Sequence, residues 1–165
     1  MKNLVLLVVC LLFAGCATTL PRDHERAVST AFAEPGKTVL GQFFQAEIAA
    51  NPGKSGLVLV PTGEWGFRAR AGLLNQAEET IDVQYYIWEV DTAGTILAER
   101  LLRAADRGVR VRMLLDHVTT KNTDFKFARM DFHPNIEIRV FNPFANRSFR
   151  SLEFMFGLER LNHRM

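Results

Sequence analysis

The stretch that decides the fold is residues 102–116, LRAADRGVRVRMLLD. Its first half continues one face of a helix, on which four apolar residues recur at positions i, i+3, i+4 and i+7: Ala98, Leu101, Leu102 and Ala105. Asp91 or Thr92 can cap the start of this helix, and Gly108 stands where a C-terminal cap belongs. Residues 109–116 then become apolar on both sides, which is typical of a parallel strand covered by helices.

Regular patterns continue on both sides of this stretch. Residues 65–79 carry apolar side chains at helical spacing, and residues 80–88 alternate as a half-buried strand does. Residues 136–141 supply another strand, and Leu57–Val60 is expected to form a short one. Strand, helix and strand in succession make a right-handed crossover unit. We therefore expect an α/β fold in which a mixed sheet is flanked by helices on both faces.

The N-terminus has the pattern of an export signal. Lys2 precedes an unbroken apolar run from Leu4 to Ala14, and Gly15-Cys16 follows it. Eleven residues of helix would reach only about 17 Å at about 1.5 Å per residue, so the run is too short to remain as a membrane span. We expect residues 1–15 to be removed. An ordinary signal with a chance cysteine near the cut is the alternative.

The cysteine gives this signal a more specific interpretation. Phe13-Ala14-Gly15-Cys16 resembles the lipobox of bacterial lipoproteins, with Phe in place of the usual Leu. This resemblance implies that Cys16 is the lipid attachment site and that its thiol is consumed, so the mature chain can form no internal disulfide. Ala17, rather than Asp, resembles the sorting pattern of outer-membrane lipoproteins. We expect a lipid anchor in the bacterial cell envelope, on the outer membrane facing the periplasm, and a tether over residues 16–56.

Composition excludes some classes of function. The 165 residues are 48% hydrophobic and 23% charged, with a net charge of +2, so no large basic excess points to nucleic acid. The sequence contains no glycine-rich phosphate loop, no Gly-x-Ser-x-Gly elbow, no His-Glu-x-x-His zinc helix and no paired cysteines at metal spacing. The four histidines are scattered through the chain at His24, His117, His133 and His163. A lone histidine is more often a surface or loop residue than a ligand.

Three stretches of the ordered half carry a family resemblance. They are residues 81–87 (IDVQYYI), residues 102–116, and residues 141–144 (FNPF) leading to residues 161–165 (LNHRM). Together they resemble the phospholipase D superfamily, in its cardiolipin synthase branch. The resemblance implies an incomplete phospholipase D-like domain over residues 57–165, phosphatidyl transfer by the complete protein, and no metal or organic cofactor.

The catalytic motif of that superfamily is absent from this sequence. The family uses His-x-Lys-x-x-x-x-Asp, normally twice, with one histidine as the nucleophile and the other as the general acid. His163 is followed by Arg164 and Met165, so it does not fit the motif, and the stretch resembling residues 161–165 runs in the family directly into the catalytic histidine. We therefore expect no catalytic residue within these residues and no activity from them alone.

Other residues are weaker candidates for a site. Asp116, at the carboxyl end of its strand, can line a polar pocket or cap a loop, and His117 follows it where many relatives carry an acidic residue. Four arginines can contact phosphate headgroups or simply be solvated: Arg139, Arg147, Arg150 and Arg164. The expected partners are membrane phospholipids, and no nucleic acid is expected.

Three hypotheses about function follow. The chain is the N-terminal part of a lipoprotein phosphatidyltransferase, or it is a truncated, non-catalytic lipoprotein that acts at most as a membrane-surface binding module. A periplasmic nuclease of the same superfamily is disfavoured by the lipid anchor and the near-neutral charge.

Overall fold

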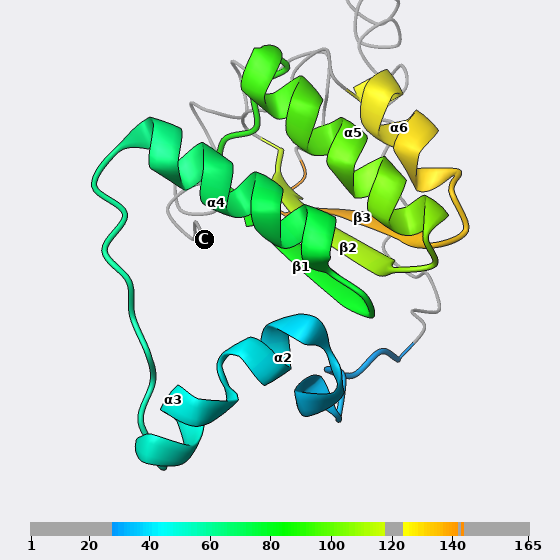
Figure 1. The fold of residues 1–165 in the computed structure, drawn as a ribbon. Helices are drawn as coiled ribbons and strands as arrows, with labels where there is room; N and C mark the ends of the chain where they lie inside the picture. The colour runs from blue at the N-terminus through cyan, green and yellow to red at the C-terminus, as the bar shows by residue number, and fades with distance from the viewer. Residues whose placement is uncertain (1–27, 118–123, 142, 144–165) are drawn as a thin grey trace, which may run out of the picture. The chain divides into compact units, whose positions relative to one another are not determined.

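The structure is a computed structural model, and it describes residues 28–117, 124–141 and 143. Some candidate residues lie outside the described ranges: Cys16, His24, Arg147, Arg150, His163 and Arg164. An N-terminal stretch carries the short helices η1 (Pro35–Lys37), α2 (Val39–Phe43) and α3 (Gln45–Ala50). The elements that follow alternate helix and strand (Figure 1): α4 (Gly63–Gln76), β1 (Thr80–Tyr85), α5 (Thr92–Asp106), β2 (Arg110–Asp116), α6 (Asp124–Asp131) and β3 (Ile136–Phe141).

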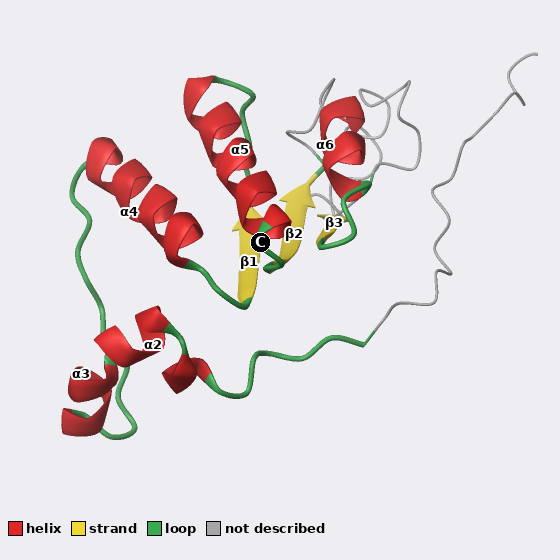
Figure 2. Ribbon diagram, turned by 45° about the vertical axis from the view of Figure 1, so that its right-hand side comes forward, coloured by secondary structure: helices red, strands yellow, loops and turns green. Residues whose placement is uncertain are grey.

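The three strands form one parallel sheet in the order β1-β2-β3. Strand order follows chain order, so two right-handed crossovers in the same direction place α5 and α6 on the same face. Figures 1 and 2 show α4, α5 and α6 on that side of the sheet. The α/β class and the helix-flanked sheet are confirmed. Among the described elements, however, the strands are all parallel and the helices cover one face, whereas we expected mixed pairing and helices on both faces.

The core lies between β2 and α5. β2 buries Val111, Met113 and Leu115, each no more than 1% exposed, on its helix-facing side. The buried face of α5 consists of Leu97, Leu101, Ala104 and Ala105, with Ala98 and Leu102 packed against it as partly buried residues. Of the four residues predicted for the buried face, Leu101 and Ala105 are therefore observed on it. Asp91 is the observed cap, because its carboxylate accepts a 2.8 Å hydrogen bond from the backbone N–H of Gly94.

Local chemistry explains the ends of the other elements. The hydroxyl of Thr62 accepts a hydrogen bond from the N–H of Trp65, so α4 begins at Gly63, two residues earlier than expected. Gly108 has a φ of +96°, in the left-handed region that glycine tolerates, and it turns the chain from α5 into β2. The guanidinium of Arg107 donates to the carbonyl oxygens of Leu74, Asn75 and Ala77, and this ties the end of α4 to the end of α5.

The prediction of a strand at Leu57–Val60 is wrong. These residues have no regular structure, and their exposed fractions run from 96% at Leu57 to 41% at Val60. Their β-branched and apolar composition favours a strand, but a strand also needs a neighbour with which to pair, and that is not a local property. The preceding tether region, within residues 35–50, is more regular than expected, although its three short helices bury no residue.

No helix in the described part of the chain is both long and apolar enough to cross a bilayer.

The packing of Leu101 gives a test of this core. Leu101 is 0% exposed, so Leu101→Ala should leave a cavity and lower the free energy of unfolding by about 2–5 kcal/mol. Leu73→Ala is the matched control, because Leu73 is 52% exposed and its truncation should cost no more than about 0.5 kcal/mol. Pulse proteolysis across a urea series measures both in the membrane-extracted protein. Equal losses for the two variants would contradict the assigned core.

Candidate functional site

The helix-free face of the sheet carries a row of charged residues. Side chains alternate along each strand, so those that do not face the helices point to this side. The pairing register places Asp82 of β1, Arg112 of β2 and Glu137 of β3 in one row across the sheet. Gln84, Leu114 and Arg139 form the next row. A groove of about 360 Å³ runs along this face and is lined by both rows together with Ser29.

Arg112 and Asp82 form a two-point ion pair on this face. Nε of Arg112 lies 2.5 Å from Oδ1 of Asp82, and Nη2 lies 2.7 Å from Oδ2. The hydrogen bond from Arg112, followed by the positive charges of Arg112 and Arg110, holds the pKa of Asp82 below its usual value against the opposing effect of partial burial. Asp82 in turn raises the pKa of Arg112. The pair fixes the guanidinium at the centre of the face.

The chain preceding η1 also contacts these arginines. Nη1 of Arg112 donates a 2.6 Å hydrogen bond to the hydroxyl of Ser29, and Nη2 of Arg110 donates a 2.8 Å bond to the carbonyl oxygen of Thr30. Arg139, one of the expected phosphate contacts, forms an ion pair with Glu137, and both side chains are nearly half exposed. A phosphate at Arg139 would therefore compete with a carboxylate that is already in place.

Asp116 is the last residue of β2 and His117 follows it; both are almost completely buried, at 1% and 0% exposure. The backbone N–H of His117 donates to the carbonyl oxygen of Phe141, and Asp116 pairs in register with Phe141. Asp116 lines neither the groove on the charged face nor the one beside β1. The roles proposed for it from the sequence, a pocket wall or a loop cap, stay predictions.

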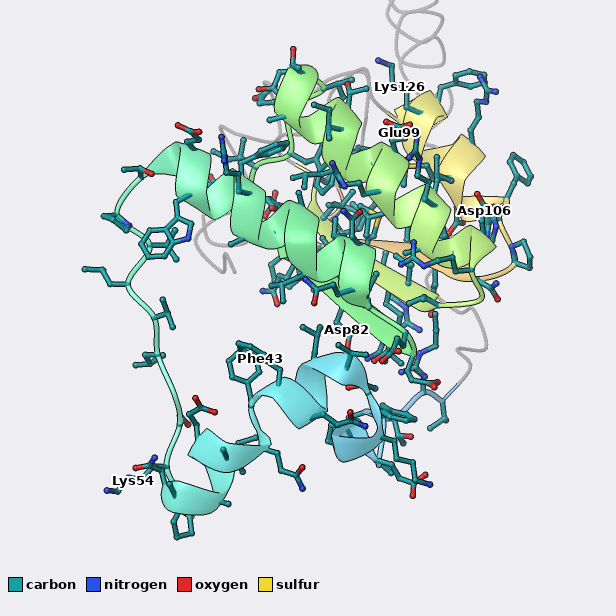
Figure 3. All side chains as sticks on the ribbon, in the orientation of Figure 1. Phe43, Lys54, Asp82, Glu99, Asp106 and Lys126 are labelled. Carbon is teal, nitrogen blue, oxygen red and sulfur yellow. The ribbon has the colours of Figure 1, made fainter. Side chains whose placement is uncertain are left out.

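His133 is partly exposed, and its hydrogen bonds join two elements of the fold. Its Nδ1 accepts a hydrogen bond from the backbone N–H of Asn135, so the proton of the neutral ring is on Nε2, which lies 3.2 Å from Oδ1 of Asp106. Figure 3 shows Asp106 at the C-terminal end of α5. This bond connects the turn before β3 to α5. Among the described residues, no group of three or more His, Cys, Asp or Glu side chains is arranged to hold a metal ion.

A second groove, of about 520 Å³, lies beside β1 and was not anticipated from the sequence. Its walls are mainly apolar, with contributions from Leu40, Leu73, Trp88 and Leu97. Arg70 provides a polar end, because its Nη1 lies 3.1 Å from the hydroxyl of Tyr85 and its guanidinium lies 5.9 Å from the centre of the same ring. The helical pattern of residues 65–79 gives no sign that Arg70 meets a tyrosine of β1.

Comparisons with known proteins identify the kind of domain. Residues 71–154 match the family model described as "Cardiolipin synthase, PLD-like domain", where PLD denotes phospholipase D. Cardiolipin synthase C of Escherichia coli is 47% identical over 115 residues, which are 70% of this chain and 24% of that protein. An uncharacterized protein of Helicobacter pylori is 30% identical over the whole chain and 33% of its own length. Cardiolipin synthase 1 of Bacillus anthracis is 32% identical over 52% of this chain and 17% of that protein. The chain thus spans no more than about a third of these relatives.

The ion pair between Asp82 and Arg112 generates a prediction about pH. Because the folded-state pKa of Asp82 is lowered, its contribution to stability is present above the unfolded-state pKa and is lost as the pH falls through the folded-state pKa. Asp82→Asn should therefore lower the free energy of unfolding by up to about 1 kcal/mol at pH 7, and the difference from the native protein should vanish at pH values well below 3.8. Urea midpoints measured between pH 2 and pH 7 provide the check.

The same substitution in an Arg112→Gln background is the control. With the guanidinium gone, Asp82→Asn should change neither the urea midpoint at pH 7 nor its pH dependence by a comparable amount. An undiminished effect in that background would show that Arg112 is not the cause of the lowered pKa.

Proposed function

Because the chain belongs to the cardiolipin synthase family of phospholipase D-like domains, we propose that it forms the N-terminal part of a membrane-anchored phosphatidyltransferase that makes cardiolipin. The observation that carries this proposal is the 47% identity to cardiolipin synthase C of Escherichia coli over 115 residues. The chain spans 24% of that relative, so the activity proposed is that of the complete protein. Membrane phospholipids are the proposed partners.

These 165 residues would contribute scaffold and attachment to this activity. None of the four histidines begins a His-x-Lys-x-x-x-x-Asp motif. A phosphohistidine route needs one imidazole to attack phosphorus and a second to protonate the departing oxygen. Both must come from outside this sequence. The parallel sheet and its helices supply the packed core on which the remainder of such a domain is built.

Lipid analysis of cells tests the proposed activity. In a host that lacks its own cardiolipin synthases, the complete gene product should restore cardiolipin, measured by mass spectrometry of extracted lipids. Residues 1–165 alone should give the level of the empty vector, because they lack both catalytic motifs. Cardiolipin made by residues 1–165 alone would overturn the assignment of chemistry to the missing histidines.

A non-catalytic, membrane-surface lipoprotein is the second candidate. The mass of the native product decides between the two. An antibody against residues 60–110 should detect a membrane protein far larger than 18.7 kDa if the enzyme proposal is correct. A band near 18.7 kDa would favour the non-catalytic module.

We also propose that acyl chains on Cys16 hold the protein on the outer membrane, facing the periplasm. Support comes from the lipobox-like Phe13-Ala14-Gly15-Cys16 and from Ala17. Each acyl chain contributes about 0.8 kcal/mol per buried methylene, and two chains give stable anchoring.

The anchor has a direct test. Cys16→Ser should abolish labelling by radioactive palmitate and move the protein out of the washed membrane fraction. Ala17→Asp is the matched variant, because it should keep the label but shift the protein from the outer to the inner membrane on a sucrose gradient. Palmitate labelling that survives Cys16→Ser would place the lipid elsewhere.

A further inference from the structure

Exposed apolar side chains are concentrated in one stretch of this chain, residues 39–60. Among the described residues, fourteen large hydrophobic side chains are exposed, and eight of them fall within these 22 positions. The eight are Val39, Phe43, Phe44, Ile48, Leu57, Val58, Leu59 and Val60. Exposed apolar residues concentrated in one stretch are typical of a segment that contacts a partner, whereas isolated ones are ordinary.

Two further properties of this apolar segment, residues 39–60, narrow the kind of partner. Its helices α2 and α3 bury no residue, and Phe43 and Phe44 contact each other edge to face with their ring centres 4.9 Å apart. Figure 3 shows Phe43 projecting from α2. The segment contains two charged residues of opposite sign, Glu47 and Lys54, so it has no net charge. An apolar, aromatic, neutral surface is suited to the boundary between lipid headgroups and acyl chains.

The position of the segment in the chain indicates which apolar surface it meets. Cys16 precedes Val39 by 23 positions. That length of chain spans at most about 80 Å even when fully extended, so a lipid on Cys16 would keep the segment within that distance of the bilayer. Tethering of this kind makes the second contact intramolecular and gives it a high effective concentration, so modest intrinsic affinity suffices.

We propose that residues 39–60 form a second membrane contact, in which Phe43, Phe44 and Ile48 insert into the lipid interface. The proposal rests on the lipid anchor of the proposed function. With the anchor, it makes a two-point attachment that limits how far the α/β domain can move from the bilayer surface. Phospholipid headgroups and acyl chains are the partner, and no sequence-specific protein partner is required.

Quenching by brominated lipids tests this directly. The complete, lipidated protein is reconstituted into phosphatidylethanolamine and phosphatidylglycerol vesicles whose acyl chains carry bromine, which quenches only tryptophans in contact with it. Phe43→Trp should lose about half or more of the added fluorescence. Phe132→Trp is the matched control, because Phe132 is 85% exposed but lies between α6 and β3, and its added fluorescence should be unchanged. Trp88 is 5% exposed and serves as an internal reference for folding.

The outcomes separate the inference from the anchor. Mass spectrometry of the N-terminal peptide reports acylation of Cys16 independently. Acylated protein in which Phe43→Trp is unquenched overturns the inference and leaves the anchor standing. Quenching in protein without acyl chains supports the inference and overturns the anchor. A Phe43→Trp signal shielded from both brominated lipid and aqueous acrylamide would mean that another part of the protein covers the segment, and this too overturns the inference.

Binding of the unlipidated protein provides a second measurement. In the Cys16→Ser background, Phe43→Ser combined with Ile48→Ser should reduce partitioning onto the same vesicles by about tenfold or more, because two large apolar groups no longer leave water. Phe125→Ser combined with Phe132→Ser removes two exposed phenylalanines outside the segment and should leave partitioning within about twofold of the background. Equal losses for the two pairs would overturn the proposal.

Discussion

β2 has a hydrogen-bonded parallel strand on each side, and the rest of the described fold depends on this central position. A strand paired on both edges can direct its side chains only above and below the sheet. On one side, Val111, Met113 and Leu115 are excluded from water by α5, whose Leu101 and Ala104 are 0% exposed. Parallel strands need crossovers, and crossovers in one direction bring their helices to one face. The position of β2 therefore determines where α5 and α6 can lie.

The same constraint makes the two faces of the sheet chemically different. Removing apolar side chains from water stabilises the helix-covered face, at roughly 25 cal/mol per Å² of buried area. The opposite face of β2 carries Arg110, Arg112 and Leu114, and its neighbours supply Asp82 and Glu137 in the row of Arg112. Helix packing and charge are therefore separated by the thickness of one sheet. A shift of β2 by one residue in register would move each of its side chains to the opposite face and would bury arginines beneath α5.

Local sequence patterns predicted the helix and strand of this core. Features that depend on pairing between distant residues could not be predicted in the same way. The helix at residues 92–106 and the strand at residues 110–116 are encoded by spacing, by the Asp91 cap and by Gly108, all of which lie within the elements or next to them. The pairing of Asp82 with Arg112, 30 positions apart, depends on strand register, which the sequence pattern leaves open. The prediction of a strand at residues 57–60 was wrong for the same reason. Their composition suits a strand, but its pairing partner must come from elsewhere in the chain.

The candidate site residues show a similar division. The histidine motif can be judged absent from the sequence itself, because it is a matter of spacing within eight residues. Burial of Asp116 and His117 was not predictable, since it depends on what surrounds the end of β2 in three dimensions. The groove beside β1 was missed because Arg70 and Tyr85 belong to different elements and meet only when α4 packs beside the sheet.

The charged face also constrains any element that covers it in a longer chain. Arg112 and Asp82 satisfy each other through two hydrogen bonds, but their side chains remain 29% and 55% exposed to water. Covering such a pair with apolar side chains would remove that water, and the desolvation cost of ions can exceed their mutual attraction. A covering element must therefore bring polar groups to Arg112 and to the half-exposed pair of Arg139 and Glu137. The apolar face carries no charges that need polar partners, so helices with apolar stripes can cover it.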